Sequence, residues 1–149
     1  MQKITFIGLG VMGYPMAGHL SKEGYDVTVY NRSEEKSKLW VKNHIGNYST
    51  SIKEAVTDSD IVFSCVGNDT DLREITLGTD KAFSSMKPDS VFIDHTTTSS
   101  DIAVELSEKA KELNINFLDA PVSGGEVGAI KGELTVMIGG ENSIFEKIK

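Results

Sequence analysis

Short apolar segments alternate with segments of helical spacing along most of the chain, and this alternation limits the possible folds more than any other feature. The segments expected to form strands are 4–7, 25–30, 47–49, 61–66, 91–94, 115–119 and 134–138. Helices are expected at 33–42 and 52–56, after the first strand, and from Ile102 to Leu113. A repeated strand–helix order is typical of an α/β domain with a doubly wound, mostly parallel sheet.

Length and composition indicate one soluble globular domain, spanning residues 1–149. The chain has 39% apolar and 25% charged residues, which is globular rather than disordered composition. Its 22 acidic and 15 basic residues give a net charge of −7, which disfavours nucleic acid and anionic lipid as partners. The single cysteine excludes an internal disulfide, and no apolar run approaches membrane-spanning length. We therefore expect a cytoplasmic protein without a membrane segment.

A glycine-rich turn lies between the first predicted strand and the first predicted helix. It has the form G-x-G-x-x-G and consists of Gly8, Leu9, Gly10, Val11, Met12 and Gly13. In a dinucleotide-binding unit the first glycine permits the tight turn, the second lets the backbone approach a pyrophosphate, and the third allows close packing of helix on strand. The following helix directs its free N–H groups at the phosphates. The turn therefore predicts a dinucleotide site.

The end of the second predicted strand indicates which dinucleotide is preferred. An NAD site places a carboxylate there, about 20 residues after the glycines, to accept a hydrogen bond from the ribose 2′-hydroxyl. This chain instead has the cationic or hydrogen-bonding side chains Asn31, Arg32, Ser33 and, one helical turn later, Lys36. A guanidinium suits a 2′-phosphate. We predict that NADP is preferred, with NAD as the alternative.

Three further loops follow predicted strands, and ligands of open parallel sheets bind at such positions. The loops consist of Val66, Gly67 and Asn68; of His95, Thr96 and Thr97; and of Ser123, Gly124 and Gly125 with the preceding Pro121 and Val122. The last offers a hydroxyl and two unhindered N–H groups, which suit a carboxylate. Each loop also has a plain structural interpretation, as a turn former, a set of helix-capping residues or a flexible connection.

Several other residues are expected to have structural roles. His19 and His44 lack partners at metal-ligand spacing and are expected at the surface, so no metal site is predicted. Cys65 lies in an apolar segment and is expected to be a core residue. Thr98 and Asp101 have the spacing of a capping box ahead of the helix that contains Ile102.

Two stretches together resemble the β-hydroxyacid dehydrogenases, the family of 3-hydroxyisobutyrate dehydrogenase, tartronate semialdehyde reductase and the glyoxylate/succinic semialdehyde reductases. The first is FIGLGVMGYPMA at 6–17. The second starts with DAPVSGG at 119–125 and continues through Gly128-Ala129 to GELTVMIGG at 132–140. The order and spacing of these stretches span nearly the whole chain, and the second is far more specific than a glycine-rich turn alone.

The resemblance implies a role for each loop. Val11 and Met12 would line the pyrophosphate; Val66, Gly67 and Asn68 would flank the cofactor ribose; Thr96 would lie beside the nicotinamide; and Ser123, Gly124 and Gly125 would hold a small carboxylate substrate. Asn31 and Arg32 look like the NADP-preferring branch. The chain departs from relatives at Gly67, where they often carry proline, and at His95–Thr97, where they often show a serine-rich run.

The resemblance also implies a second, all-helical domain that supplies a catalytic lysine and much of a dimer interface. This chain ends inside a predicted helix at 142–149, and we interpret it as the N-terminal cofactor domain of a homo-oligomeric enzyme. It would contain no catalytic residue and turn over poorly alone. The alternatives are a cofactor domain like that of 6-phosphogluconate dehydrogenase, which shares Ser123–Glu126, an imine reductase, and a non-catalytic dinucleotide-binding or assembly module.

Overall fold

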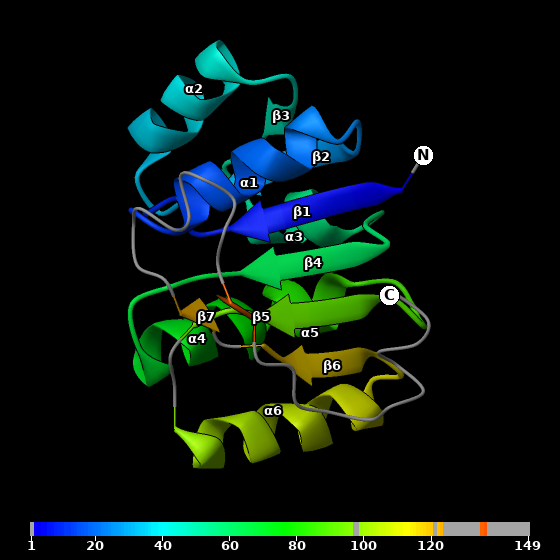
Figure 1. Cartoon of the computed structure of the whole chain (residues 1–149). Coiled ribbons are helices and arrows are strands. Elements are labelled where there is room, and N and C mark those ends of the chain that lie inside the picture. Colours follow the sequence, from blue (N-terminus) through cyan, green and yellow to red (C-terminus); the bar gives the residue numbers. More distant parts are fainter. Residues whose placement is uncertain (1, 97–98, 121, 124–134, 137–149) are drawn as a thin grey trace.

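A six-stranded parallel sheet forms the centre of the molecule (Figure 1). The computed structural model describes residues 2–96, 99–120, 122–123 and 135–136. The strands are β1 (Lys3–Ile7), β2 (Asp26–Tyr30), β3 (Asn47–Tyr48), β4 (Ile61–Ser64), β5 (Val91–Asp94) and β6 (Asn116–Asp119). Their order in the sheet is β3-β2-β1-β4-β5-β6, and all five pairings are parallel. The predicted doubly wound fold is confirmed, and this sheet is wholly parallel.

Helices cover both faces of the sheet. They are α1 (Gly13–Lys22), α2 (Glu34–Asn43), α3 (Ile52–Val56), α4 (Asp69–Thr76), α5 (Ala82–Ser85) and α6 (Ser100–Glu112). Buried residues of α1 and α2 share one apolar cluster with the sheet, and those of α3 to α6 share another. In the part of the chain that the structure describes, no helix is long and apolar enough to cross a membrane.

The direction of chain winding reverses between β1 and β4. The chain passes from β1 outward to β2 and β3, then returns to β4 on the other side of β1 and continues to β5 and β6. The loops after β1 and β4 therefore diverge onto opposite faces. This is the topological switch point at which open α/β sheets bind ligands, and the glycine-rich turn lies there (Figure 1).

Alternating side chains of the strands divide between the two faces, as period-two strands require. On β1, Ile4 and Phe6 belong to the cluster under α1 and α2, whereas Ile7 belongs to the cluster under α3 to α6. Thr5 is wholly buried, and its hydroxyl donates to the carbonyl of Ala55 in α3. The central strand thus contributes to both cores, which fixes its register against its neighbours.

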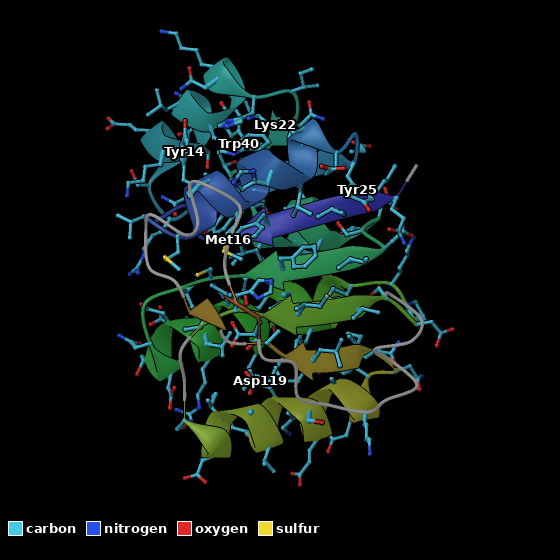
Figure 2. All side chains as sticks on the ribbon, viewed as in Figure 1. Tyr14, Met16, Lys22, Tyr25, Trp40 and Asp119 are labelled. Carbon is cyan, nitrogen blue, oxygen red and sulfur yellow. The ribbon has the colours of Figure 1, made fainter. Side chains whose placement is uncertain are left out.

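An aromatic cluster joins α1 to α2. Trp40 of α2 is wholly buried, and Figure 2 shows it close to Tyr14 of α1. His44 stacks on Trp40 with ring centroids 4.8 Å apart, meets Tyr14 edge-on at 5.5 Å, and pairs through Nδ1 with the Trp40 carbonyl oxygen at 3.0 Å. The sequence predicted a surface position for His44, and in the structure its ring is half-buried against this cluster.

Three other details differ from the sequence expectation. Residues 135–136 form β8 (Thr135–Val136), which pairs antiparallel with β7 (Val122–Ser123) in a separate two-stranded sheet. Helices α4 and α5 were not predicted. The cap of α6 is Ser99, whose Oγ accepts from the Ile102 N–H at 3.3 Å, while the expected cap, Thr98, lies outside the described residues.

Candidate functional site

A groove of about 880 Å³ opens at the carboxyl ends of β1, β2 and β4. It brings together most of the residues that the sequence predicted to bind a dinucleotide. Those that line it are Gly8, Gly10, Val11, Met12, Gly13, Asn31, Arg32, Ser33, Lys36, Val66 and Gly67. The groove is therefore built from the three segments that the topology brings to the switch point.

The first and third glycines of the turn have no room for a side chain. A Cβ on Gly8 would lie 2.2 Å from the Cys65 carbonyl oxygen, and Gly8 has a φ of +100°, which favours glycine. A Cβ on Gly13 would lie 1.9 Å from the Gly8 carbonyl oxygen. Gly10 is different, since a Cβ there would meet no atom of the described residues within 4 Å. Gly8 and Gly13 shape the turn, whereas Gly10 presents open backbone to the groove.

The N-terminus of α1 carries no cap from its own side chains. Its N-cap residue is Met12, which makes no side-chain hydrogen bond, and the first turn contains no acidic residue. The first N–H groups of a helix need partners from outside the helix, and the positive end of the dipole favours an anion there. Both properties suit a phosphate group at this end of the groove.

Asn31 ties the glycine turn to the end of β2. Its Oδ1 accepts a hydrogen bond from the Leu9 N–H at 2.9 Å, and its Nδ2 donates to the Ser33 carbonyl oxygen at 3.1 Å. The Leu9 side chain is 1% exposed and packs in the core under α1 and α2. Of these two residues, Asn31 lines the groove, while Leu9 supports the turn from behind.

Arg32 and Lys36 bring positive charge to the β2 end of the groove. The Arg32 side chain is 81% exposed, and its Nη2 lies 3.6 Å from Oδ1 of Asp71 on α4. The Lys36 N–H donates to the Ser33 carbonyl oxygen, so Lys36 occupies the first turn of α2. The guanidinium is accessible to a ligand and is paired only loosely at this distance.

A buried polar network supports the loop after β4. The Val66 N–H donates to Oγ1 of Thr96 at 2.9 Å, and the Thr96 N–H donates to Oδ1 of Asp94 at 3.0 Å. The Ser64 hydroxyl donates to the same carboxylate oxygen at 2.8 Å. Thr96 is 2% exposed and is absent from the residues lining the groove. In this structure Thr96 therefore positions Val66.

Asp94 is a buried acid within this network. Its side chain is fully enclosed, and its Oδ2 has no hydrogen-bond partner among the residues that the structure describes. Burial raises the pKa of the Asp94 carboxyl to about 6, although hydrogen bonds from Thr96 and Ser64 act in the opposite direction. Burial also lowers the pKa of the neighbouring His95, whose Nδ1 pairs with the Ala120 carbonyl oxygen at 2.7 Å. Sequence reasoning assigned no role to Asp94, although an acid at the end of an apolar strand is a recognisable signal.

The structure describes Asn68, but only part of the predicted carboxylate-binding loop at Ser123, Gly124 and Gly125. The Asn68 side chain caps α4, with Oδ1 accepting from the Asp71 N–H at 2.9 Å, whereas the structural alternative for Asn68 was a turn former. Its predicted contact with the cofactor ribose remains a prediction. Ser123 lies in β7, opposite Thr135 of β8. Gly124 and Gly125 lie outside the described residues. The predicted carboxylate contacts of this loop remain predictions.

Comparison with known proteins identifies the domain. Residues 3–149 match the family described as the NAD binding domain of 6-phosphogluconate dehydrogenase. The chain belongs to this family. This NAD-binding domain is 52% identical, over 100% of its length and 51% of the relative's, to an oxidoreductase from Shewanella frigidimarina named as uncharacterized. It is 41% identical, over 97% of its length and 48% of the relative's, to probable 3-hydroxyisobutyrate dehydrogenase-like 2, mitochondrial, from Arabidopsis thaliana.

The comparison of this NAD-binding domain with solved structures finds the same kind of protein as the comparison of sequences. It superposes on Mycobacterium tuberculosis 3-hydroxyisobutyrate dehydrogenase, whose structure is described with L-serine, with a TM-score of 0.93 and 31% identity. The match covers 100% of this chain and 50% of that chain. The resemblance to the β-hydroxyacid dehydrogenases is confirmed, and the chain spans about half the length of these three relatives.

Proposed function

We propose that this NAD-binding domain prefers NADP(H) and serves an oxidoreductase that transfers a hydride between the cofactor and a small 3-hydroxy acid or semialdehyde. One observation carries the cofactor preference. The groove that begins at the uncapped N-terminus of α1 ends at the exposed guanidinium of Arg32, where an NAD site would place a carboxylate.

The groove residues fit a dinucleotide. Open backbone at Gly10 and the first N–H groups of α1 suit the pyrophosphate, since Gly10 has no side chain and Met12 makes no side-chain cap to α1. Arg32, Ser33 and Lys36 suit a 2′-phosphate. Val66 lines the groove on the β4 side, where its N–H is held by Thr96. When bound, the nicotinamide supplies a hydride donor or acceptor.

Arg32 is expected to determine how strongly NADP(H) is preferred over NAD(H). A hydrogen bond to a charged group contributes about 1.5–3 kcal/mol, which corresponds to roughly ten- to hundredfold in affinity. Lys36 adds a second, weaker attraction because its ammonium is a point charge without the planar geometry of a guanidinium. NAD(H) binding is expected to persist at lower affinity, since the turn and the α1 terminus do not distinguish the two cofactors.

The test is a side-by-side titration of the chain with NADPH and NADH, followed by fluorescence or calorimetry. We expect NADPH to bind more tightly, and Arg32→Ala to remove most of the difference. Lys38→Ala is a matched control, because Lys38 is also on α2 but pairs with Glu34 and does not line the groove. Equal affinities for the two cofactors in the parent chain, or an unchanged ratio in Arg32→Ala, would contradict the preference.

The substrate proposal concerns the whole protein. We propose that the loop at Ser123, Gly124 and Gly125 holds a small carboxylate, and that a lysine in a second domain transfers the proton, as the family resemblance implies. The present chain is then expected to bind NADPH and turn over poorly. Proton transfer of this kind contributes a factor of about 10²–10⁴. Rapid steady-state reduction of succinic or tartronate semialdehyde by the 149-residue chain would refute this part.

A substrate panel separates this proposal from its nearest alternative. The whole protein would be assayed with 3-hydroxy acids, semialdehydes and phosphorylated sugar acids. Turnover of unphosphorylated small acids supports the proposal, and turnover of 6-phosphogluconate alone supports the alternative. Binding of NADPH with no turnover of any acid would favour a non-catalytic dinucleotide-binding module.

A further inference from the structure

An acidic side chain faces the predicted phosphate-binding guanidinium across the groove. Asp71 lies on α4, which follows β4, whereas Arg32 follows β2, so their ion pair joins two walls of the groove. The Asp71 side chain is 23% exposed, compared with 81% for Arg32. The carboxylate is thus largely buried, whereas the guanidinium is largely exposed to solvent.

The loop before α4 places Asp71 at this position. The Asp71 N–H donates to Oδ1 of Asn68, which sets Asp71 in the first turn of the helix. Its Oδ2 lies against Gly67, where a Cβ would come within 2.6 Å of that oxygen. Because Gly67 has no side chain, the carboxylate can occupy this space and point toward Arg32.

We propose that Asp71 is a specificity-determining residue that competes with the cofactor's 2′-phosphate for Arg32 and so limits the preference for NADP(H) over NAD(H). This inference rests on the proposed dinucleotide site. A 2′-phosphate that approaches Arg32 must replace the carboxylate or lie near it, and like charges repel. A 2′-hydroxyl is neutral and does not experience this repulsion.

The chain offers variants that isolate this effect. Asp71→Asn removes the charge and keeps the shape, and Gly67→Ala is expected to displace the carboxylate while leaving it charged. Glu74→Gln removes the same charge from a residue that also lines the groove, one turn further along α4. Arg32→Ala removes the cation for which the two anions compete.

The probes are 2′,5′-ADP and 5′-AMP, which differ in the 2′-phosphate and lack the nicotinamide. Asp71→Asn should raise the affinity ratio of 2′,5′-ADP to 5′-AMP by about three- to tenfold, given the strength of a partly exposed ion pair and the added repulsion. Gly67→Ala should change the ratio in the same direction, and Glu74→Gln should have a smaller effect. In the Arg32→Ala background, the effect of Asp71→Asn should fall well below its effect in the parent chain.

Three results would overturn the inference: an unchanged ratio in Asp71→Asn, an equal change in Glu74→Gln, or a lower ratio in Asp71→Asn. The last would mean that Asp71 holds Arg32 in position for the phosphate. Failure of the proposed dinucleotide site is distinguishable, because the parent chain would then bind neither probe. Preference of the parent chain for 2′,5′-ADP with no response to Asp71→Asn would overturn this inference alone.

Discussion

The side-chain oxygen of Asn31 accepts a hydrogen bond from the Leu9 N–H at 2.9 Å, so the end of β2 is attached to the glycine turn after β1. The Nδ2 of the same side chain donates a hydrogen bond to the Ser33 carbonyl oxygen. We expect Asn31→Ala to weaken NADPH and NADH binding by similar factors, because it loosens the turn that both cofactors use. A hydrogen bond of about 0.5–1.5 kcal/mol corresponds to about two- to tenfold.

Titration of Asn31→Ala and Arg32→Ala with NADPH and with NADH tests this prediction. Arg32→Ala is the comparison, since it should reduce NADPH affinity much more than NADH affinity. If Asn31→Ala reduced NADPH affinity alone, its side chain would act directly on the 2′-phosphate rather than through the turn.

Substitutions at two glycines of the turn are expected to affect different properties, stability at Gly13 and dinucleotide binding at Gly10. In Gly13→Ala, the new Cβ would overlap the Gly8 carbonyl oxygen, and the backbone must shift. We expect this variant to lose about 1–3 kcal/mol of unfolding free energy. In Gly10→Ala, the methyl group meets none of the described residues, so stability should stay within about 0.5 kcal/mol while dinucleotide affinity falls.

Chemical denaturation and NADPH titration of the two variants give the measurement. The expected pattern is a large stability loss for Gly13→Ala and a selective binding loss for Gly10→Ala. Unchanged NADPH affinity in Gly10→Ala would show that the cofactor does not approach this part of the turn.

The sequence predicted β1, β4 and β5 well because these strands are buried on both faces and consist mostly of apolar residues. The predicted bounds of 91–94 and 52–56 coincide with β5 and α3. Helices α4 and α5 were missed. The cap of α4 is Asn68, which equally indicates a turn, and α5 has only four residues, too few for a periodic signal.

The candidate site was predicted where a motif fixes the backbone, and less well where contacts are distant in sequence. The glycine turn and Arg32 line one groove, as expected. The pairing of Arg32 with Asp71, and the link from Asp94 through Thr96 to Val66, join separate crossover units. No local pattern encodes such contacts, because they depend on which strands become neighbours in the sheet.

Asp94 should make the chain less stable as the pH rises. Burial raises the pKa of its carboxyl to about 6, above the value of about 3.9 in an unfolded chain, so folding favours the protonated form. Its stabilising contribution is therefore full below about pH 4 and is lost as the pH rises to about 6. The stability of the parent chain relative to Asp94→Asn should fall by roughly 2–3 kcal/mol between these limits.

Unfolding free energies of both chains, measured by urea denaturation from pH 4 to pH 7.5, test this. Using the difference removes the contribution of His95, whose lowered pKa gives a dependence of the opposite sign. Parallel curves for the two chains would contradict the prediction. The measurement also reports on the loop after β4, because Asp94 accepts a hydrogen bond from the Thr96 N–H and the Thr96 hydroxyl accepts one from the Val66 N–H.

Cys65 lines the groove and should react slowly with thiol reagents. Burial raises the pKa of its thiol to about 11, and the charge of Asp94 adds to this. At pH 8 the thiolate fraction is then about two orders of magnitude below that of an ordinary cysteine, and greater intrinsic nucleophilicity recovers only about tenfold. We expect the folded chain to react with Ellman's reagent at least about tenfold more slowly than the chain in denaturant.

The chain contains one cysteine, so the reaction reports on this position alone. Asp94→Asn should accelerate the reaction of the folded chain, because it removes the charge that disfavours the thiolate. NADPH should slow the reaction further if the cofactor covers the groove. Equal rates for the folded and unfolded chains would mean that Cys65 is neither shielded nor shifted in pKa, and would contradict the burial on which this prediction depends.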